Sequence, residues 1–346
     1  MVTKRGRRAR RPPWARATDE ELLALRFRDL GIGIGGTRVQ KRVERLYDEL
    51  EQRGLRFRPH VWLSTDWFSP DGVPGVAIPF FLAHPRLTRL ERTQFLEVEG
   101  GQEEEFMRLL RHECGHAVDT AYRLRRRAEW RQHFGRASEP YGPSYTPRPY
   151  SKRFVTNLER WYAQSHPTED FAETFAVWLR PRSDWRARYE GWPARRKLQY
   201  VDSLMREIGD RPALVRCREH TESLNKLSTT LGEYYREKLE RYGERSPDVV
   251  DRDLRRLFPD DADHGRGSSA ARFLRRARPE LRRAIARWTG QYQHTIDVVL
   301  QEMIERCAEL GLRLHRSPEE ALSDATVFLT VQTMNHIHGE HHKVAR

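Results

Sequence analysis

The sequence contains few cysteines and no long apolar run. Its three cysteines, Cys114, Cys217 and Cys307, are spread over 346 residues, which excludes a small secreted fold held together by several disulfides. An odd number of distant thiols indicates a reducing compartment, and we expect a cytoplasmic location. Since no stretch of about 18 apolar residues occurs, we expect neither a membrane span nor a secretory signal.

Acidic residues are missing from residues 1–18, which contain seven lysines or arginines. Subtracting these seven from the formal net charge of +13 leaves +6 for the rest of the chain, so the body is only mildly basic. Such an arm is usually a solvated, disordered tail, and this is the interpretation that we favour. The alternative is an arm that contacts nucleic acid through its phosphates.

A buried strand is missing before Gly31, Gly33 and Gly36, whose spacing fits a dinucleotide-binding turn. Such a turn needs a strand directly before it, and residues 25–30 are too short and too charged to form one. We therefore expect no nucleotide cofactor. The glycines are interpreted as a flexible approach to a helix over residues 37–53.

What the sequence does contain is a His-Glu-x-x-His pattern within residues 111–119. On a helix, His112 and His116 lie one turn apart on a common face and can bind one zinc ion. Glu113 lies about 100° from His112 around the helix, so it suits a general base better than a ligand. Periodicity places Cys114 on the opposite, packing side as a small core residue, while the histidine side is expected to line a cleft. The alternative is a chance match on a charged helix.

A catalytic zinc site needs a third protein ligand, and the candidates lie in residues 161–176. Ser165 followed by His-Pro-Thr predicts the start of a helix. On that helix Glu169 and Glu173 share the flank of an apolar stripe, whereas Asp170 points away. We interpret one of these two glutamates as a ligand and the other as a carboxylate that orients an imidazole. The alternative is three solvated acids at a helix start.

These motifs resemble those of the bacterial zinc-binding metallopeptidases. More distantly, they are similar to gluzincins such as Pro-Pro endopeptidase and the lethal factor protease domain. In that group the zinc-binding glutamate lies four residues before the glutamate of a Phe-Ala-Glu step and seven residues after a tyrosine, and both spacings occur here. The distant likeness covers residues 106–180 and departs at Asp170, where those relatives carry an aromatic residue. The closer likeness extends over most of the first 210 residues.

The resemblance implies a role for each matching residue. The implied zinc ligands are His112, His116 and Glu169, with Glu113 as the base, Tyr162 as a donor to the oxyanion, and Glu173 as a supporting residue. We expect Asp119, on the same helix as the histidines, to be a further supporting residue. For Tyr162 the alternative is an ordinary core aromatic that precedes a helix.

The sheet is expected to be small. Residues 55–63 alternate between apolar and polar side chains and predict a half-buried strand. Residues 73–82 predict an edge strand because Pro74 and Pro79 interrupt them. That edge either pairs with an extended peptide substrate or belongs to an ordinary hairpin. The proline-rich residues 135–150 form either a cleft-lining loop or a surface loop.

Beyond Pro212 the sequence is highly charged and predicts helices, notably over residues 221–242 and 279–310. Ser317 begins a capping box with a proline at the first helical position. We find no repeat and no zinc-finger spacing here. Four histidines near the end are interpreted as an exposed terminus rather than a second metal site, namely His336, His338, His341 and His342.

Together these patterns predict an α+β fold with a basic tail over residues 1–18. We expect a zincin-like catalytic domain with a small sheet and an active-site helix over residues 19–210, and a mostly α-helical region over residues 211–346. The predicted function is a zinc-dependent metallopeptidase of the gluzincin type, with Zn²⁺ as cofactor, a peptide or protein as substrate and no membrane partner. The alternative is a non-catalytic, zinc-stabilised binding or regulatory protein.

Overall fold

The structure is a computed structural model of the whole chain. Among its described residues, no helix combines the length and the apolarity needed to cross a lipid bilayer. Residues 1–11 of the expected basic tail lie outside the described part, and so do His341 and His342. The described residues are 12–142, 145, 148, 150–159, 161–242, 251–258 and 268–338.

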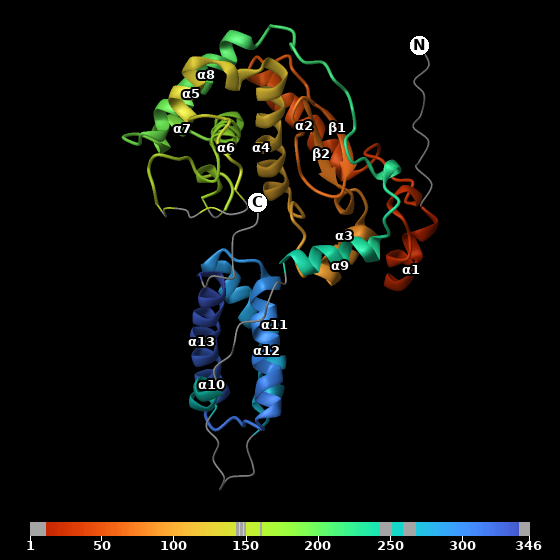
Figure 1. Ribbon diagram of the computed structural model, residues 1–346, viewed down its shortest axis with the longest axis vertical. Coiled ribbons are helices and arrows are strands. Elements are labelled where there is room, and N and C mark those ends of the chain that lie inside the picture. Colours follow the sequence, from red (N-terminus) through yellow and green to blue (C-terminus); the bar gives the residue numbers. More distant parts are fainter. Residues whose placement is uncertain are drawn as a thin grey trace. The chain divides into compact units, whose positions relative to one another are not determined.

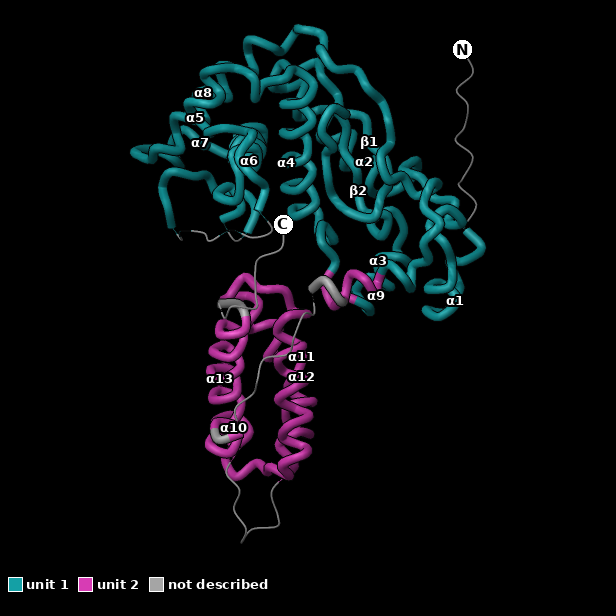
Figure 2. The backbone as a smooth tube through the Cα atoms, in the orientation of Figure 1, with its two compact units in different colours: residues 1–94, 98–234 teal, residues 95–97, 235–346 magenta. Residues whose placement is uncertain are grey.

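The chain divides into two compact units (Figure 2). Unit 1 comprises residues 1–94 and 98–234, and unit 2 comprises residues 95–97 and 235–346. Unit 1 therefore reaches beyond residue 210, where we placed the end of the catalytic domain. The domain boundary itself stays a prediction, because a compact unit and a domain that functions alone need not end at the same residue.

Helices dominate both units, and one small sheet accompanies them (Figure 1), which confirms the expected α+β, mostly helical fold. In chain order the elements are α1 (Asp19–Leu23), α2 (Arg38–Gln52), β1 (His60–Ser64), β2 (Gly75–Pro79), α3 (Pro85–Phe95), α4 (Glu103–Tyr122), α5 (Ala128–Phe134), α6 (Pro167–Leu179), α7 (Trp185–Arg188), α8 (Ala194–Ile208), α9 (Leu231–Tyr242), α10 (Asp251–Leu257), α11 (Ala270–Thr289), α12 (Gln293–Glu309) and α13 (Pro318–His338).

The two strands of the sheet run parallel, with His60 paired to Gly75 and Ser64 to Pro79. The hairpin alternative is therefore wrong, because a hairpin joins antiparallel strands. Residues 55–59 lie outside β1, so the predicted first strand was too long. On the other edge of β2, the Ala77 amide donates to the Phe68 carbonyl over 2.8 Å. All five residues of β2 are buried, and pairing of this strand with a substrate peptide stays a prediction.

Helix α4 lies between α6 on one side and α2 with β2 on the other (Figure 1). Gly115 makes the close contact with α6 possible, since a Cβ atom at this position would lie 2.9 Å from the Cα of Ala172. The histidine side of α4 was expected to line a cleft. This prediction was wrong for His112 and Asp119, which are both buried. The opposite side is core as expected, and Cys114 is fully buried there.

Helix α6 begins one residue later than the sequence indicated. The residue that caps it is His166, not Ser165, and the His166 imidazole accepts a hydrogen bond from the Thr168 amide over 3.2 Å. Every residue of α6 is buried. Asp170 is therefore not a solvated acid, and its carboxylate pairs with Lys197.

Unit 2 contains a second core, formed by α10 to α13 together with Leu312. The helix predicted over residues 279–310 is two helices, because Gly290 adopts a left-handed conformation and ends α11. The helix predicted from residue 221 begins only at Leu231. His336 was expected to be exposed but is buried on α13.

Candidate metal centre

Three side chains from α4 and α6 converge on one point. The Nε2 atoms of His112 and His116 lie 3.2 Å apart. One carboxylate oxygen of Glu169, Oε2, lies 3.0 Å from the first and 3.1 Å from the second. Within the described part of the chain, this is the one group of three or more metal-ligating side chains whose ligand atoms cluster in this way.

The triangle has the size that a zinc ion requires. Ligand atoms placed at roughly 2.0–2.2 Å around a tetrahedral zinc ion lie about 3.3–3.6 Å from one another. The three observed separations of 3.0, 3.1 and 3.2 Å are only slightly shorter. Two imidazoles and one carboxylate are also a known zinc donor set, and they leave a fourth position for water or substrate. The three residues therefore fit a zinc ion, and among the described residues they supply three ligand atoms.

Glu173, one turn beyond Glu169 on α6, orients the first histidine. Its Oε1 lies 2.8 Å from Nδ1 of His112. The same carboxylate accepts hydrogen bonds from the Asn157 side chain and the Leu158 amide, both over 2.8 Å. With a proton on Nδ1, the Nε2 lone pair of His112 points toward the other ligands.

Charge in this interior is balanced between the imidazoles and the carboxylates. Burial opposes the charged form of His112, but the hydrogen bonds that its ring donates to Glu169 and Glu173 raise its pKa well above the usual value. Burial likewise opposes the charged form of Glu169, but His116 and His112 hold its pKa well below the usual value. Glu169 is therefore an anion at neutral pH, as a metal ligand must be.

Glu113 follows the first histidine on α4 and is nearly buried, with 8% of its surface exposed. Burial raises the pKa of its carboxyl group, while His112 and His116 lower it. It does not belong to the ligand triangle. The structure thus places Glu113 beside the ligands without making it one, as the helical spacing predicted.

Tyr162 lies in a short 3₁₀-helix, Tyr162–Gln164, with its ring centroid 5.6 Å from that of His112. Burial raises the pKa of its phenol, which therefore stays protonated and able to donate. Its hydroxyl shares a hydrogen bond with Tyr141, and the Tyr141 hydroxyl donates to Oε1 of Glu169. Since Tyr141 belongs to the segment 135–150, the described part of that loop lines the site.

Asp119 is engaged elsewhere. Its carboxylate accepts a hydrogen bond from the Arg125 amide over 2.7 Å and pairs with the Arg125 guanidinium, which also reaches Asp71. Within the described residues, no hydrogen bond joins Asp119 to either histidine. Its position fixes the turn after α4, and a supporting role at the metal stays a prediction.

Two groups of this site were not identified from the sequence. Asn157 carries no signal of its own, because a lone asparagine in a loop has many uses. Tyr141 was noticed only as one of several tyrosines in the proline-rich loop. Gly115, by contrast, stands inside the His-Glu-x-x-His pattern, and a glycine in the middle of a helix is a signal of close packing that could have been used.

Residues 102–236 match the model of a family described as "Putative zinc-binding metallo-peptidase". No curated protein and no solved structure matches the chain, so the distant similarity to the named gluzincins stays a prediction. The matched range contains both α4 and α6, and with them all three residues of the ligand triangle. Residues 102–236, which contain the candidate metal centre, are therefore similar to the family described as "Putative zinc-binding metallo-peptidase", and the match does not extend to the rest of the chain.

Proposed function

We propose that this protein is a zinc metallopeptidase of the gluzincin type that hydrolyses peptide bonds in peptides or proteins. One observation carries the proposal. The two imidazoles and one carboxylate of the triangle form an incomplete tetrahedron, and an uncoordinated glutamate, Glu113, stands next to it on the same helix. A purely structural metal site has no use for such a glutamate.

His112, His116 and Glu169 would hold the ion. When bound, zinc would supply Lewis acidity, which promotes ionisation of water and polarises a carbonyl group. Glu113 accepts a proton from the attacking water and then donates it to the leaving amine. Its raised pKa suits both steps, because a carboxyl group that ionises closer to neutral pH holds and releases a proton more readily.

Tyr162 donates a hydrogen bond to the oxyanion that develops on the attacked carbonyl. Its phenol stays protonated at neutral pH and lies beside His112. The Tyr141 hydroxyl, which donates to the outer oxygen of Glu169, holds that carboxylate in the orientation needed for its inner oxygen to face the histidines. Peptide substrate approaches on the side where Tyr141 is about half exposed.

The test is Glu113→Gln in the full-length protein loaded with one equivalent of zinc. We expect zinc content to be unchanged and the cleavage of a peptide library, followed by mass spectrometry, to fall by about 10²–10⁴-fold, because the general base is lost. Tyr162→Phe should also keep zinc and should lower turnover by about 10²-fold through loss of an oxyanion donor.

The matched control is Glu104→Gln, which removes an exposed carboxylate from the first turn of α4. It should leave both zinc content and turnover unchanged. Cleavage at the wild-type rate by the zinc-loaded Glu113→Gln variant would refute the mechanism. A wild-type protein that binds zinc in this triangle and cleaves no peptide of the library would favour the non-catalytic alternative.

A further inference from the structure

A second site of interest lies at the other end of α6. A cavity of about 200 Å³ there is lined by Arg53, Arg182, Ser183, Asp184, Trp185 and Arg186. Glu169 lies in the first turn of α6, and Leu179 is its last residue. Ten residues of helix span about 15 Å, so this cavity is separate from the ligand triangle.

Two hydrogen-bond donors in the lining lack an acceptor. The Ser183 hydroxyl and the Trp185 indole N–H are both buried, and neither has a hydrogen-bond partner among the residues that the structure describes. Trp185 as a whole is only 3% exposed. A buried donor without an acceptor costs free energy, and native proteins almost always satisfy such groups. These two donors therefore point to a missing acceptor.

The net positive charge of the lining also favours a negatively charged acceptor. The residues that line the cavity carry three guanidinium groups and one carboxylate, that of Asp184. Arg186 pairs with Asp202 over 2.8 Å, but Arg53 and Arg182 form no ion pair with any described residue. Burial lowers the pKa of Arg53, and the charge of Arg186 adds to this effect although Asp202 opposes it. An anion in the cavity would relieve this repulsion.

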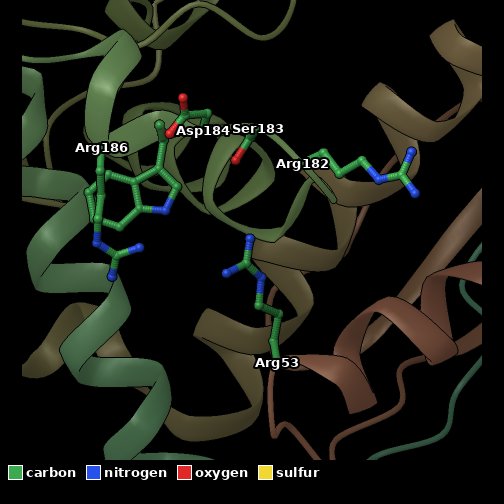
Figure 3. Close-up of a pocket in the computed structure, with 6 residues that line it drawn as sticks. Arg53, Arg182, Ser183, Asp184 and Arg186 are labelled. Carbon is green, nitrogen blue, oxygen red and sulfur yellow. The ribbon is translucent and has the colours of Figure 1, made fainter.

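The orientation of the side chains narrows the choice of donors. Figure 3 shows the guanidinium of Arg53 and the hydroxyl of Ser183 facing the same space, whereas Arg182 extends away from it. Arg53 is held in place by the Trp178 ring, whose centroid lies 5.2 Å from its guanidinium carbon. Arg182 can adjust on binding, because its side chain is exposed.

We propose that this cavity binds a phosphate-type oxyanion, with Arg53, Ser183 and Trp185 as its donors. A guanidinium group offers two parallel N–H donors to such an anion, and the hydroxyl and indole donors can bond its remaining oxygens. The proposal does not depend on the metal centre. The anion is either free phosphate or a phosphate group on a larger molecule, since both present the same oxygens.

The test follows the indole N–H signal of Trp185 by NMR in full-length protein labelled with ¹⁵N-tryptophan. Trp185→Phe identifies the signal by its disappearance. Inorganic phosphate is then added at constant ionic strength, with chloride as the competing anion. We expect a saturable shift of the Trp185 signal with phosphate and none with chloride.

Two variants locate the site. Arg53→Gln should weaken phosphate binding at least about tenfold, since a hydrogen bond to a charged group is lost. Ser183→Ala removes one donor without disturbing packing and should weaken binding by a smaller factor. The control is Arg56→Gln, which removes the same charge from an exposed arginine that pairs with Asp210 over 2.8 Å, and should change nothing.

The proposal is overturned if the indole N–H signal of Trp185 does not shift when phosphate is added, or if chloride shifts it equally. So does an Arg53→Gln variant that binds phosphate as well as the Arg56→Gln control. Phosphoserine serves as the second probe. Tighter binding of phosphoserine than of inorganic phosphate identifies an attached phosphate group as the ligand, and equal or weaker binding identifies the free ion.

Discussion

The two compact units bury different kinds of side chain. Between α4 and α6, unit 1 buries His112 together with three glutamates, and His116 beside them is partly buried. The core of unit 2 is an entirely apolar cluster, and the buried polar groups described there are Thr295, Gln332, Thr333 and His336. Burying charged groups costs free energy unless they are paired or bind metal. The polar interior of unit 1 is consistent with the metal ion that it could hold, whereas the apolar cluster of unit 2 stabilises that unit by hydrophobic burial.

We expect the largest effect from a substitution that removes one of the proposed zinc ligands of unit 1. In Glu169→Ala the ligand triangle loses its carboxylate, and we expect the affinity for zinc to fall by more than about 100-fold, beyond the effect typical of residues that only orient a ligand. Zinc content after dialysis, measured by mass spectrometry, checks this. Glu169→Gln keeps the volume and should also lose zinc, because a neutral amide is a poor zinc ligand.

Zinc retention at the wild-type level in both Glu169 variants would show that a different side chain completes the site. Hydrogen exchange gives a second readout in the wild-type protein. Because a ligand stabilises the part of a protein that binds it, added zinc should slow exchange in α4 and α6 and leave α11 to α13 unchanged.

A substitution in the apolar core should instead destabilise unit 2. Leu274 on α11 is completely buried in the apolar cluster. Leu274→Ala should lower the free energy of unfolding of that unit by about 2–5 kcal/mol through lost burial and an added cavity. Denaturant unfolding followed by hydrogen exchange in α11 and α12 measures the loss.

The comparison predicts that Leu274→Ala leaves zinc binding intact, because the ligands belong to unit 1. The exposed Val327 on α13 provides the control, since Val327→Ala should cost little. If Leu274→Ala reduced zinc affinity as much as a ligand variant does, the two units would not be independent in stability.

The sequence could predict the relation between site residues on one helix better than contacts between residues on two different helices. His112, Glu113 and His116 belong to one helix, so the helical period alone fixed their relation. The partnership with Glu169 and Glu173 joins two helices, and spacing along α6 could nominate those residues but not distinguish their roles. That assignment came from the family resemblance. His112, His116 and Glu169 lie close enough to hold a metal ion, while the individual roles stay predictions.

The features that could not be predicted from the sequence depend on packing between segments that lie far apart in the chain. The sequence predicts which side of α4 carries the histidines, but not that α6 covers that side so closely that His112 is buried. Likewise, the patterns of residues 55–63 and 73–82 predict two strands, but the parallel pairing of β1 with β2 depends on the path of the chain between them. The position of Asn157 beside Glu173 is a loop property that no periodicity reports.

Among the substitutions at the candidate metal centre, Glu173→Gln is expected to have the smallest effect on zinc affinity. The glutamate accepts three hydrogen bonds, from His112, Asn157 and Leu158. A glutamine offers only one oxygen, and its amide N–H₂ must face at least one of these donors. Residues that orient a metal ligand typically contribute 10–100-fold to metal affinity, so we expect zinc to bind about 10–100-fold more weakly, as measured by competition with a chelator.

Thr174→Val is the matched control for burial, because Thr174 is as buried as Glu173 and its hydroxyl hydrogen-bonds to Asp170, not to a histidine of the site. Both variants disturb the interior of α6, but only Glu173→Gln alters the hydrogen bond to Nδ1 of His112. If the two lowered zinc affinity equally, the effect would come from packing, and Glu173 would have no orienting role. A selective loss in Glu173→Gln means that the buried carboxylate acts on the metal through the imidazole, which no residue in the apolar core of unit 2 can do.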